Sequence, residues 1–324
     1  MRIAIYGVGG VGGYFGGHLA LAGADVVFLA RGEHLAALRR DGLTLELPGA
    51  TRVARPVSAV ADPAEAGPVD VVLLAVKTWQ VADAARAMAP MLGPETFVVP
   101  LQNGVESPSE LAAVLGAERV VGGLCGTISW IVAPGRVRSL GSTHFLRFGE
   151  LDRRRTGRCE RLRDALVAAG VRAEIPDDIE VAMWEKFLFV VPFGGVGAAA
   201  DMPIGVLRSL PETRALIARA MREIEAVARA RGVALAPDRV ERSLAGGDAL
   251  SPEGTTSMHR DLLAGRPSEL EAWTGAVVRL GAAAGVPTPI HDVLYRVLLP
   301  RELAARGRLA DLPRGAAGDV PAQI

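Results

Sequence analysis

Short apolar runs alternate with amphipathic or glycine-rich stretches along the first half of the chain. Runs of strand length cover residues 2–7, 25–30, 69–77 and 96–104, and helical patterns follow them at 11–22, 32–42, 78–90 and 106–116. The run at 69–77 is apolar almost throughout, which is typical of a strand covered on both faces. This alternation predicts an α/β fold with a Rossmann-type, doubly wound parallel sheet.

The pattern changes after about residue 175. Pro176-Asp177-Asp178 has the composition of a turn that starts a helix, and long amphipathic runs follow at 211–232, 268–284 and 288–306. We therefore expect a first domain over 1–177 and an all-helical C-terminal domain over 178–324. The Gly- and Pro-rich tail from about residue 307 is expected to be loosely held.

Length and composition exclude several classes of protein. The 324 residues are enough for two domains, and 50% of them are hydrophobic, so burial is ample. Lys+Arg and Asp+Glu both number 36, and this balance argues against a nucleic-acid partner. Cys125 and Cys159 lack a metal or redox spacing, and the five histidines form no metal-binding pair. We expect no metal site and a cytoplasmic location.

Two apolar stretches have to be distinguished from membrane segments. Glycine-rich turns and Asp25 interrupt the first thirty residues, unlike the apolar core of a signal peptide. Residues 187–200 are uncharged over only fourteen positions, which is too short to span a bilayer. The sequence predicts a soluble chain with no membrane partner.

A glycine-rich turn directly follows the first predicted strand. Gly7, Gly9 and Gly12 have the G-x-G-x-x-G spacing, in which the glycines permit a tight turn, close approach to a pyrophosphate and close helix–strand packing. The helix that follows would direct its unpaired N–H groups at phosphates. The turn therefore predicts a dinucleotide site, which also includes the intervening residues Val8, Gly10 and Val11.

The residue at the end of the second predicted strand indicates which dinucleotide binds. An NAD enzyme has an acidic residue there, whereas this chain has Arg31, nineteen residues after Gly12. An arginine suits a 2′-phosphate and favours NADP(H). The alternative is a solvated arginine at a strand end. Glu33 is expected in the first turn of the next helix, where the helix dipole favours an acid.

Polar residues end two later strands. Lys77 closes the run 69–77, and Asn103 lies at the end of the next strand, in Asn-Gly. Ligands of parallel sheets bind at the carboxyl ends of the strands, so both residues are candidates for contact with cofactor or substrate. Asn103 has the alternative of serving only as a turn residue.

Lys186 lies in a stretch that otherwise has the pattern of a buried helix, MWEKFLFVVPFGG. A lysine on an apolar face needs either a partner or a route for its head group to water. The alternatives are an ammonium that reaches past the helix edge or pairs with a surface acid, and an ammonium used in catalysis. The residues alone leave both open.

The chain resembles the ketopantoate reductase family (2-dehydropantoate 2-reductases) over nearly its whole length. The resemblance rests on the glycine turn and on ARGEH, VKTWQ, LQNG, WEKF and SMHRDLLAGRPSELEAWTG, in that order. It implies a Rossmann domain, a helical C-terminal domain, and NADPH-dependent reduction of a 2-keto acid to a 2-hydroxy acid. Lys186 would be the proton donor and Glu269 the acid where cofactor and substrate meet. Arg31, Lys77 and Asn103 would contact cofactor, and Asn103 and Ser257 substrate.

Some of these residues have a simpler explanation. Ser268 and Glu271 match a capping box, so Glu269 between them could merely answer the helix dipole. Ser257 could be an ordinary helix-start serine. His259 is interpreted as structural.

The chain departs from the family at substrate positions. Val190 and Gly194 stand four and eight residues after Lys186, where family members usually have asparagines, and Ile204 and Thr274 replace two others. Lost amides reduce discrimination for polar substrate groups, so the pocket is expected to be more apolar. Pro192 removes the helix hydrogen bond to Leu188 and is expected to reshape the helix.

Three functions remain open. The first is reduction of 2-dehydropantoate to pantoate. The second is reduction or oxidation of a bulkier, less polar substrate. The third is a non-catalytic NADP-binding redox sensor, against which Lys186 and Glu269 argue. A homodimer through the helical domain is also possible.

Overall fold

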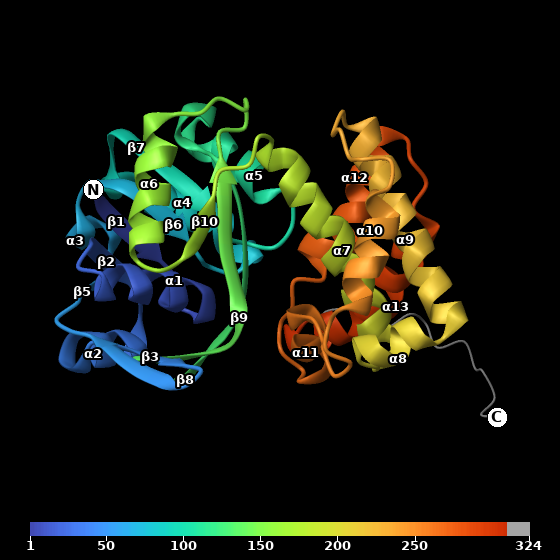
Figure 1. Cartoon of the computed structure of the whole chain (residues 1–324), viewed down its shortest axis with the longest axis horizontal. Coiled ribbons are helices and arrows are strands. Elements are labelled where there is room, and N and C mark those ends of the chain that lie inside the picture. Colours follow the sequence, from blue (N-terminus) through green and yellow to red (C-terminus); the bar gives the residue numbers. More distant parts are fainter. Residues whose placement is uncertain (310–324) are drawn as a thin grey trace. The chain divides into compact units, whose positions relative to one another are not determined.

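The computed structural model describes residues 1–309, apart from the side chains of 142 and 143. The chain forms two compact units (Figure 1). Unit 1 comprises Met1–Phe187 with Val233–Leu235, and unit 2 comprises Leu188–Gly232 and the chain from Ala236 onward. The division falls inside one helix, α7 (Ile179–Ala200). Residues 310–324, which make up most of the tail predicted to be loose, lie outside the described residues.

Unit 1 contains the predicted parallel sheet. Its order is β5-β2-β1-β6-β7, and every neighbouring pair is parallel. The strands are β1 (Arg2–Tyr6), β2 (Asp25–Leu29), β5 (Ser58–Val60), β6 (Val69–Leu74) and β7 (Leu92–Pro100). The helical elements between and after them are α1 (Gly10–Leu21), α2 (Gly32–Asp41), α3 (Pro63–Ala66), η1 (Thr78–Gln80), α4 (Val81–Ala87), η2 (Ala89–Met91), α5 (Ser107–Leu115) and η3 (Ala117–Arg119).

The sheet is buried on both faces, as its apolar strands predict. Alternate residues of β1 enter different cores: Ile3 and Ile5 pack with Phe15 of α1, while Ala4 packs with Val81 of α4. Strand β6 ends at Leu74, three residues before Lys77, because the chain there turns into η1. The doubly wound fold is therefore confirmed, with a shorter central strand than the apolar pattern indicates.

A second, mixed sheet in unit 1 has no counterpart among the predicted elements. Its order is β10-β9-β3-β4, and β8 pairs with β9 as a long antiparallel hairpin. The strands are β3 (Leu43–Leu47), β4 (Ala50–Ala54), β8 (Gly122–Ala133), β9 (Arg136–Gly149) and β10 (Arg172–Glu174), with α6 (Gly157–Ala168) before β10. β8 opens on two glycines, a residue depleted in strands, which weakens the sequence signal.

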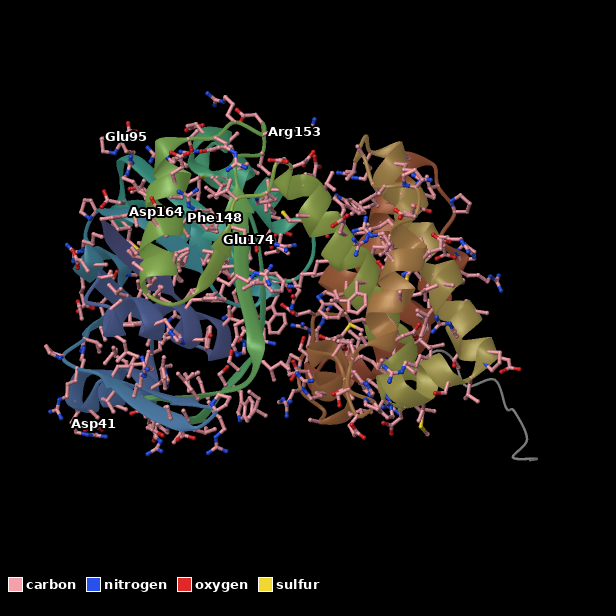
Figure 2. The ribbon with its side chains drawn as sticks, viewed as in Figure 1. Asp41, Glu95, Phe148, Arg153, Asp164 and Glu174 are labelled. Atoms are coloured by element: carbon pink, nitrogen blue, oxygen red, sulfur yellow. The ribbon has the colours of Figure 1, made fainter. Side chains whose placement is uncertain are left out.

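Side chains tie this second sheet together. Phe148 of β9 is fully buried, and Glu174 of β10 accepts a hydrogen bond from Arg147 of β9 at 2.8 Å (Figure 2). Glu46 of β3 binds Arg136 and Arg138 of β9 in the same way. These cross-strand pairs lie between residues far apart in the chain, so local periodicity does not reveal them.

Unit 2 is helical over its described residues 188–309, apart from the segment 233–235. Besides the end of α7 it has α8 (Ile204–Ser209), α9 (Pro211–Ala230), α10 (Arg239–Asp248), α11 (Ser257–Leu263), α12 (Ala276–Ala284) and α13 (Pro289–Ala305). The predicted helices at 211–232 and 288–306 are confirmed. The one predicted at 268–284 starts later, with a π-helical turn, η4 (Glu271–Gly275), that leads directly into α12; such turns are often found at functional sites.

Helix α7 is longer than the uncharged stretch on which the sequence argument relied. It has 22 residues, runs through Pro192, and is long and apolar enough to cross a membrane. However, 72% of its apolar window is buried within the protein. Such burial is consistent with the core helix of a soluble protein.

Candidate functional site

The glycine turn between β1 and α1 has room for a ligand on one side and none on the other. A Cβ at Gly12 would lie 2.1 Å from the carbonyl oxygen of Gly7, and one at Gly10 equally close to the carbonyl of Ser129 on β8. A Cβ at Gly9 would meet nothing within 4 Å. Gly7 has φ +99°, a conformation that favours glycine. The backbone of the turn therefore packs closely against the protein at Gly10 and Gly12 and has open space at Gly9, which fits close approach of a pyrophosphate.

The start of α1 is also suited to an anion. Gly9 is its N-cap residue, no side chain caps it, and no acidic residue lies in its first turn. The first N–H groups of a helix have no acceptor within the helix, and the dipole favours negative charge there. Val8 is buried and Val11 packs against the core, so these two residues fix the turn.

Arg31 lies where the second strand predicts it. It follows β2, has extended backbone, and precedes α2, whose first turn contains Glu33 as expected. Its side chain is exposed. Burial raises the pKa of Tyr6 at the end of β1, and the positive charge of Arg31 opposes that rise. Arg31 therefore acts electrostatically at the strand end that leads into the glycine turn.

The carboxyl ends of β6 and β7 carry a group of polar side chains. Lys77 is exposed, its ammonium lies 5.8 Å from the centre of the Trp79 ring, and its backbone N–H donates to Gln80 Oε1 at 3.3 Å. Gln102 is buried and donates from Nε2 to the carbonyls of Leu74 and Val76, both at 2.9 Å. Asn103 follows it. The sheet thus brings Lys77 and Asn103 to one edge, as predicted.

Lys186 joins this group through hydrogen bonds to uncharged oxygens. Its Nζ donates to Oδ1 of Asn103 at 2.8 Å and to the backbone carbonyl of Cys125 on β8. Asn103 is therefore more than a turn residue. The ammonium is held by an amide and a carbonyl of unit 1. We call Lys77, Gln80, Gln102, Asn103 and Lys186 the strand-end cluster.

Two members of this cluster, Gln80 and Gln102, escaped the sequence analysis, although composition contains a signal for them. Of the 36 Lys and Arg residues only Lys77 and Lys186 are lysines. The chain has one asparagine, Asn103, and three glutamines, at positions 80, 102 and 323. Apart from position 323, every lysine and every amide side chain of the chain therefore belongs to the strand-end cluster. Lysine differs from arginine in that it can release a proton, so its rarity elsewhere is informative.

The substrate positions on α7 that follow Lys186 belong to unit 2. Val190 is half-buried, and Gly194 is buried against two side chains of the same unit. A Cβ at Gly194 would lie 2.9 Å from the Trp273 ring and 3.1 Å from Oγ1 of Thr256. The Trp273 indole thus occupies the space in which a side chain at 194 would begin. Ile204 and Thr274 are also buried.

Ser257 is the first residue of α11, but another residue caps the helix. Thr256 is the N-cap, and its hydroxyl accepts the backbone N–H of His259 at 3.2 Å. Ser257 is thus a helix-start serine, as its simpler explanation expects, although Thr256 supplies the cap. His259 is buried, which lowers its pKa, and its Nε2 lies 3.7 Å from Asp201, an arrangement consistent with a structural role.

The capping box proposed around Glu269 is also wrong. Ser268 donates from its N–H and its hydroxyl to Glu302 of α13, at 3.0 and 2.6 Å. Glu271 instead accepts from Arg279 and, at 2.7 Å, from Tyr295. Glu269 itself is 6% exposed and lies two residues before the π-helical turn. The Ser268 hydroxyl also accepts the backbone N–H of Leu270 at 3.2 Å, so Ser268 caps this segment without the reciprocal bond of a capping box.

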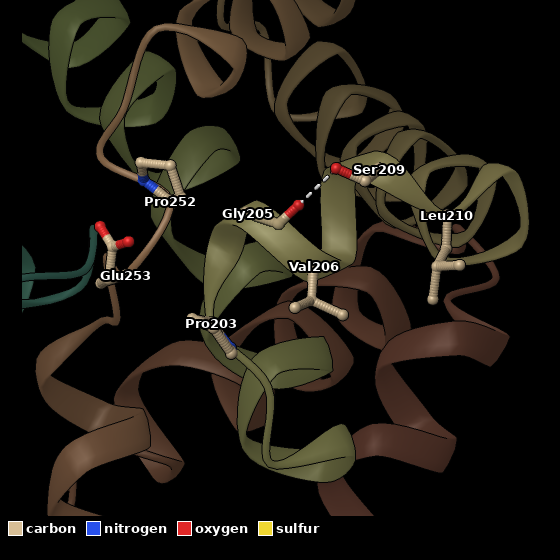
Figure 3. A pocket seen from close by; sticks show the side chains of 7 residues that line it. All are labelled: Pro203, Gly205, Val206, Ser209, Leu210, Pro252 and Glu253. Carbon is tan, nitrogen blue, oxygen red and sulfur yellow. Dashed lines mark hydrogen bonds between the residues drawn. The ribbon is translucent and has the colours of Figure 1, made fainter.

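Two further features bear on metal and ligand sites. Among the described residues no cluster of His, Cys, Asp and Glu could hold a metal ion, and Cys125 and Cys159 are buried and form no disulfide. A shallow apolar pocket lies on unit 2 at α8 (Figure 3), where the Ser209 hydroxyl donates to the carbonyl of Gly205. Its lining includes none of the predicted site residues; it consists of Pro203, Gly205, Val206, Ser209, Leu210, Pro252 and Glu253.

Comparison with known proteins identifies the family. Residues 3–153 match the model of ketopantoate reductase PanE/ApbA, and residues 178–302 match that of its C-terminal domain. A 2-dehydropantoate 2-reductase of Mesorhizobium japonicum is 35% identical over 94% of this chain and 98% of its own length. The chain belongs to the ketopantoate reductase family.

Solved structures agree. A PanE/ApbA family ketopantoate reductase from Ralstonia eutropha JMP134 has a TM-score of 0.86 and 33% identity, covering 94% of this chain and 100% of its own. A D-mandelate dehydrogenase in complex with NADH and anilino(oxo)acetate also has a TM-score of 0.86, at 23% identity, covering 94% and 99%. The latter likeness shows a shared fold. The chain is an oxidoreductase of its family, and the family's chemistry uses a nicotinamide cofactor.

Proposed function

We propose that this protein reduces a 2-keto acid to a 2-hydroxy acid with NADPH, in the manner of 2-dehydropantoate reduction to pantoate. The observation that carries the proposal is the position of Lys186, whose Nζ is held by Asn103 and the Cys125 carbonyl at the carboxyl ends of the parallel strands. Names of relatives support the substrate class, since several are 2-dehydropantoate 2-reductases.

The residues of the glycine turn and the strand ends fit the cofactor. Gly7, Val8, Gly9, Gly10, Val11 and Gly12 would hold the pyrophosphate, with the open space at Gly9 toward it. Arg31 would bind the 2′-phosphate of NADPH, because it occupies the position at which an NAD enzyme has an acid. Lys77, Asn103 and Glu269 would contact the cofactor nearer its reactive end. When bound, the cofactor supplies the hydride.

Lys186 would supply the proton. As a keto carbon is reduced, negative charge develops on its oxygen, and an ammonium stabilises that charge before it delivers a proton. The Cys125 carbonyl and Asn103 fix the position of Nζ, so the proton is held at one point. An arginine could stabilise the charge but would not release a proton. This difference accounts for a lysine at position 186 in a chain whose only other lysine is Lys77.

We assign cofactor binding to a domain over 1–177 and substrate binding to 178–324. Ser257, Val190 and Gly194 would line the substrate pocket, together with Asn103 and Lys186. A redox sensor without catalytic activity is disfavoured, because it would have no use for a positioned proton donor.

A bulkier, less polar acid is the second candidate substrate. The specific observation is that the Trp273 indole fills the space beside Gly194, where a hydrogen-bonding side chain would begin. Filling that space leaves no room for a hydrogen-bonding side chain there, and a site without that donor favours an apolar substrate group over a hydroxyl. The D-mandelate dehydrogenase of the same fold acts on an aromatic hydroxy acid, as its name states.

We further propose a cytoplasmic homodimer that associates through the helical domain. Val293 and Val297 of α13 lie one helical turn apart and are 59% and 58% exposed. Exposed apolar neighbours of this kind are typical of protein contacts. Sedimentation equilibrium should give twice the mass of the chain, and Val293→Lys with Val297→Lys should give the monomer. A wild-type monomer at micromolar concentration contradicts this proposal.

The test of function is a steady-state panel. NADPH oxidation would be measured with 2-dehydropantoate and with larger aliphatic and aromatic 2-keto acids, and each would be repeated with NADH. The highest kcat/KM with 2-dehydropantoate and NADPH supports the first candidate. A higher value with an aromatic acid supports the second. Tight NADPH binding with no turnover of any acid would refute both and leave the sensor.

A further inference from the structure

Gln102 extends the hydrogen bonding of β6 and β7 beyond the point at which the strands end. The backbone N–H of Leu101 donates to the Leu74 carbonyl at 2.9 Å. The side-chain amide of Gln102 then donates both to that carbonyl and to the carbonyl of Val76, each at 2.9 Å. Because both acceptors are carbonyls, the NH₂ group must face them, which fixes the orientation of the amide.

The carbonyls that Gln102 holds belong to the wall of the glycine turn. Ala75 donates its N–H to the Tyr6 carbonyl at 2.8 Å. A Cβ at Gly7 would lie 3.0 Å from the backbone nitrogen of Val76. Lys77 follows Val76 directly. On the other side, Gln102 precedes Asn103, which accepts the hydrogen bond from Lys186.

The amide is also costly where it lies. Gln102 is 6% exposed, and its Oε1 has no hydrogen-bond partner among the described residues. An apolar side chain would avoid burying that oxygen, and what the amide supplies in return is two hydrogen bonds to the strand end. The requirement it meets is two donors on one short planar group, directed at one strand end.

We propose that Gln102 is a positioning residue that holds Asn103, and through it the Lys186 ammonium, in register with the glycine turn and Lys77. The inference rests on the proposed reduction, because it assigns Gln102 a part in placing the proton donor. This role does not require Gln102 to contact substrate or cofactor. Loss of its two bonds lets the Asn103 loop move relative to β6, and a displacement near 1 Å costs activity steeply.

The test compares Gln102→Met with a matched control on the same two strands. Methionine keeps length and removes both donors. Thr96 is 2% exposed on β7, and its hydroxyl donates to the Val69 carbonyl at the start of β6, so Thr96→Val removes a similar bond at the opposite end. We expect kcat of Gln102→Met to fall about ten- to hundredfold, with Thr96→Val within about twofold of wild type. Both variants should lower Tm to a similar extent.

A conservative variant adds a pH readout. In Gln102→Glu a carboxylate faces two carbonyls at neutral pH, whereas the protonated acid can donate to one of them. Its kcat relative to wild type should therefore recover partly as pH falls, and that of Gln102→Met should not. Recovery in neither variant, or a kcat of Gln102→Met within twofold of wild type, overturns the inference.

A second readout does not depend on turnover. Because the chain has two lysines, protein labelled with ¹⁵N-lysine has two side-chain ammonium signals, one of them from Lys186. Gln102→Met should shift the Lys186 signal and Thr96→Val should leave it in place. If wild type reduces no keto acid, the proposed function fails while this signal still tests Gln102. An unshifted Lys186 signal in Gln102→Met overturns the positioning role.

Discussion

The strand-end cluster of unit 1 and the surroundings of Gly194 in unit 2 are built from opposite kinds of residue. The cluster collects both lysines and all but one of the amide side chains, with hydrogen bonds of 2.8 to 3.3 Å within it and to the neighbouring backbone. Around Gly194 the neighbours are an indole and a threonine already used as a helix cap. A family member that retains the strand-end cluster but has other residues around Gly194 can keep the reaction of the family and act on a different substrate.

The largest effect is expected at Lys186. Lys186→Arg keeps the positive charge and removes the transferable proton, so kcat should fall about 10²- to 10⁴-fold. Lys77→Arg, the matched control, retains a charge that needs only to bind and should keep kcat within about tenfold. Steady-state NADPH oxidation measures both, with the NADPH Kd as a check on folding. A Lys186→Arg enzyme as active as Lys77→Arg would remove the chemical distinction between the two lysines.

Gly9 offers a substitution whose effect on ligand and fold can be separated. Its φ is −80° and a Cβ would meet nothing within 4 Å, so Gly9→Ala should fold with unchanged Tm. The added methyl occupies the space toward the pyrophosphate and should raise the NADPH Kd about fivefold to a hundredfold. Gly10→Ala is the contrasting variant, because its Cβ would collide with the Ser129 carbonyl and lower Tm. An unchanged Kd in Gly9→Ala would mean that the cofactor lies elsewhere.

These two predictions rest on parts of the molecule that the sequence predicts well. The strands of the parallel sheet, the glycine turn and the positions of Arg31, Lys77 and Asn103 follow from local apolar runs and from the rule that ligands bind at strand ends. The contact of Lys186 with Asn103 joins residues 83 positions apart, and its geometry needed the fold.

The features that the sequence analysis missed share a physical cause. The hairpin of β3 and β4 joins the sheet by pairing β3 with β9, far along the chain, and β8 opens on glycines that hide its strand character. The partner of Ser268 is Glu302, 34 residues away, which no local capping rule can anticipate. Gln102 escaped because its function depends on which carbonyls lie opposite it. Only the scarcity of amides in the chain pointed to it.

A smaller effect is expected from substitutions near Gly194, which should change the selectivity of the enzyme between polar and apolar substrates. Val190 is half-buried, so Val190→Asn can add a donor without a steric conflict and should raise kcat/KM for 2-dehydropantoate about tenfold relative to an apolar 2-keto acid. Gly194→Asn should do the same only together with Trp273→Leu, because the indole blocks its Cβ. Competition between the two acids measures the ratio. If Gly194→Asn alone improves selectivity, Trp273 is not the residue that limits the pocket.

The smallest effect concerns pH and stability, and it separates the two units by their buried carboxylates. Burial tends to raise the pKa of Glu223 in unit 2, but hydrogen bonds from His291 and the backbone N–H groups of Ile290 and His291 outweigh it and lower the pKa. At Glu150 in unit 1, burial also tends to raise the pKa, but hydrogen bonds from Arg158 and Thr156 outweigh it and lower the pKa. A lowered pKa in the folded state contributes stability above the unfolded pKa near 4.5. That stability is lost as pH falls through the folded value.

Glu223→Gln and Glu150→Gln should therefore each lower Tm by a few degrees at pH 7, corresponding to about 1–3 kcal/mol. The difference from wild type should shrink as pH falls below about 4, because the wild-type carboxyls are then being protonated. Calorimetry across this pH range measures both the Tm difference at pH 7 and its decrease in acid, and Asp177→Asn, at an exposed position, is the control. If Glu223→Gln lowers Tm equally at pH 3 and pH 7, the effect of the substitution does not depend on the ionisation of Glu223. The hydrogen-bonding geometry of the carboxyl group, and not its charge, would then account for the stability. The loss of stability of unit 2 in acid would then have to come from another carboxylate. In unit 1, the hydrogen bonds from Arg158 would still make stability depend on the charge of Glu150.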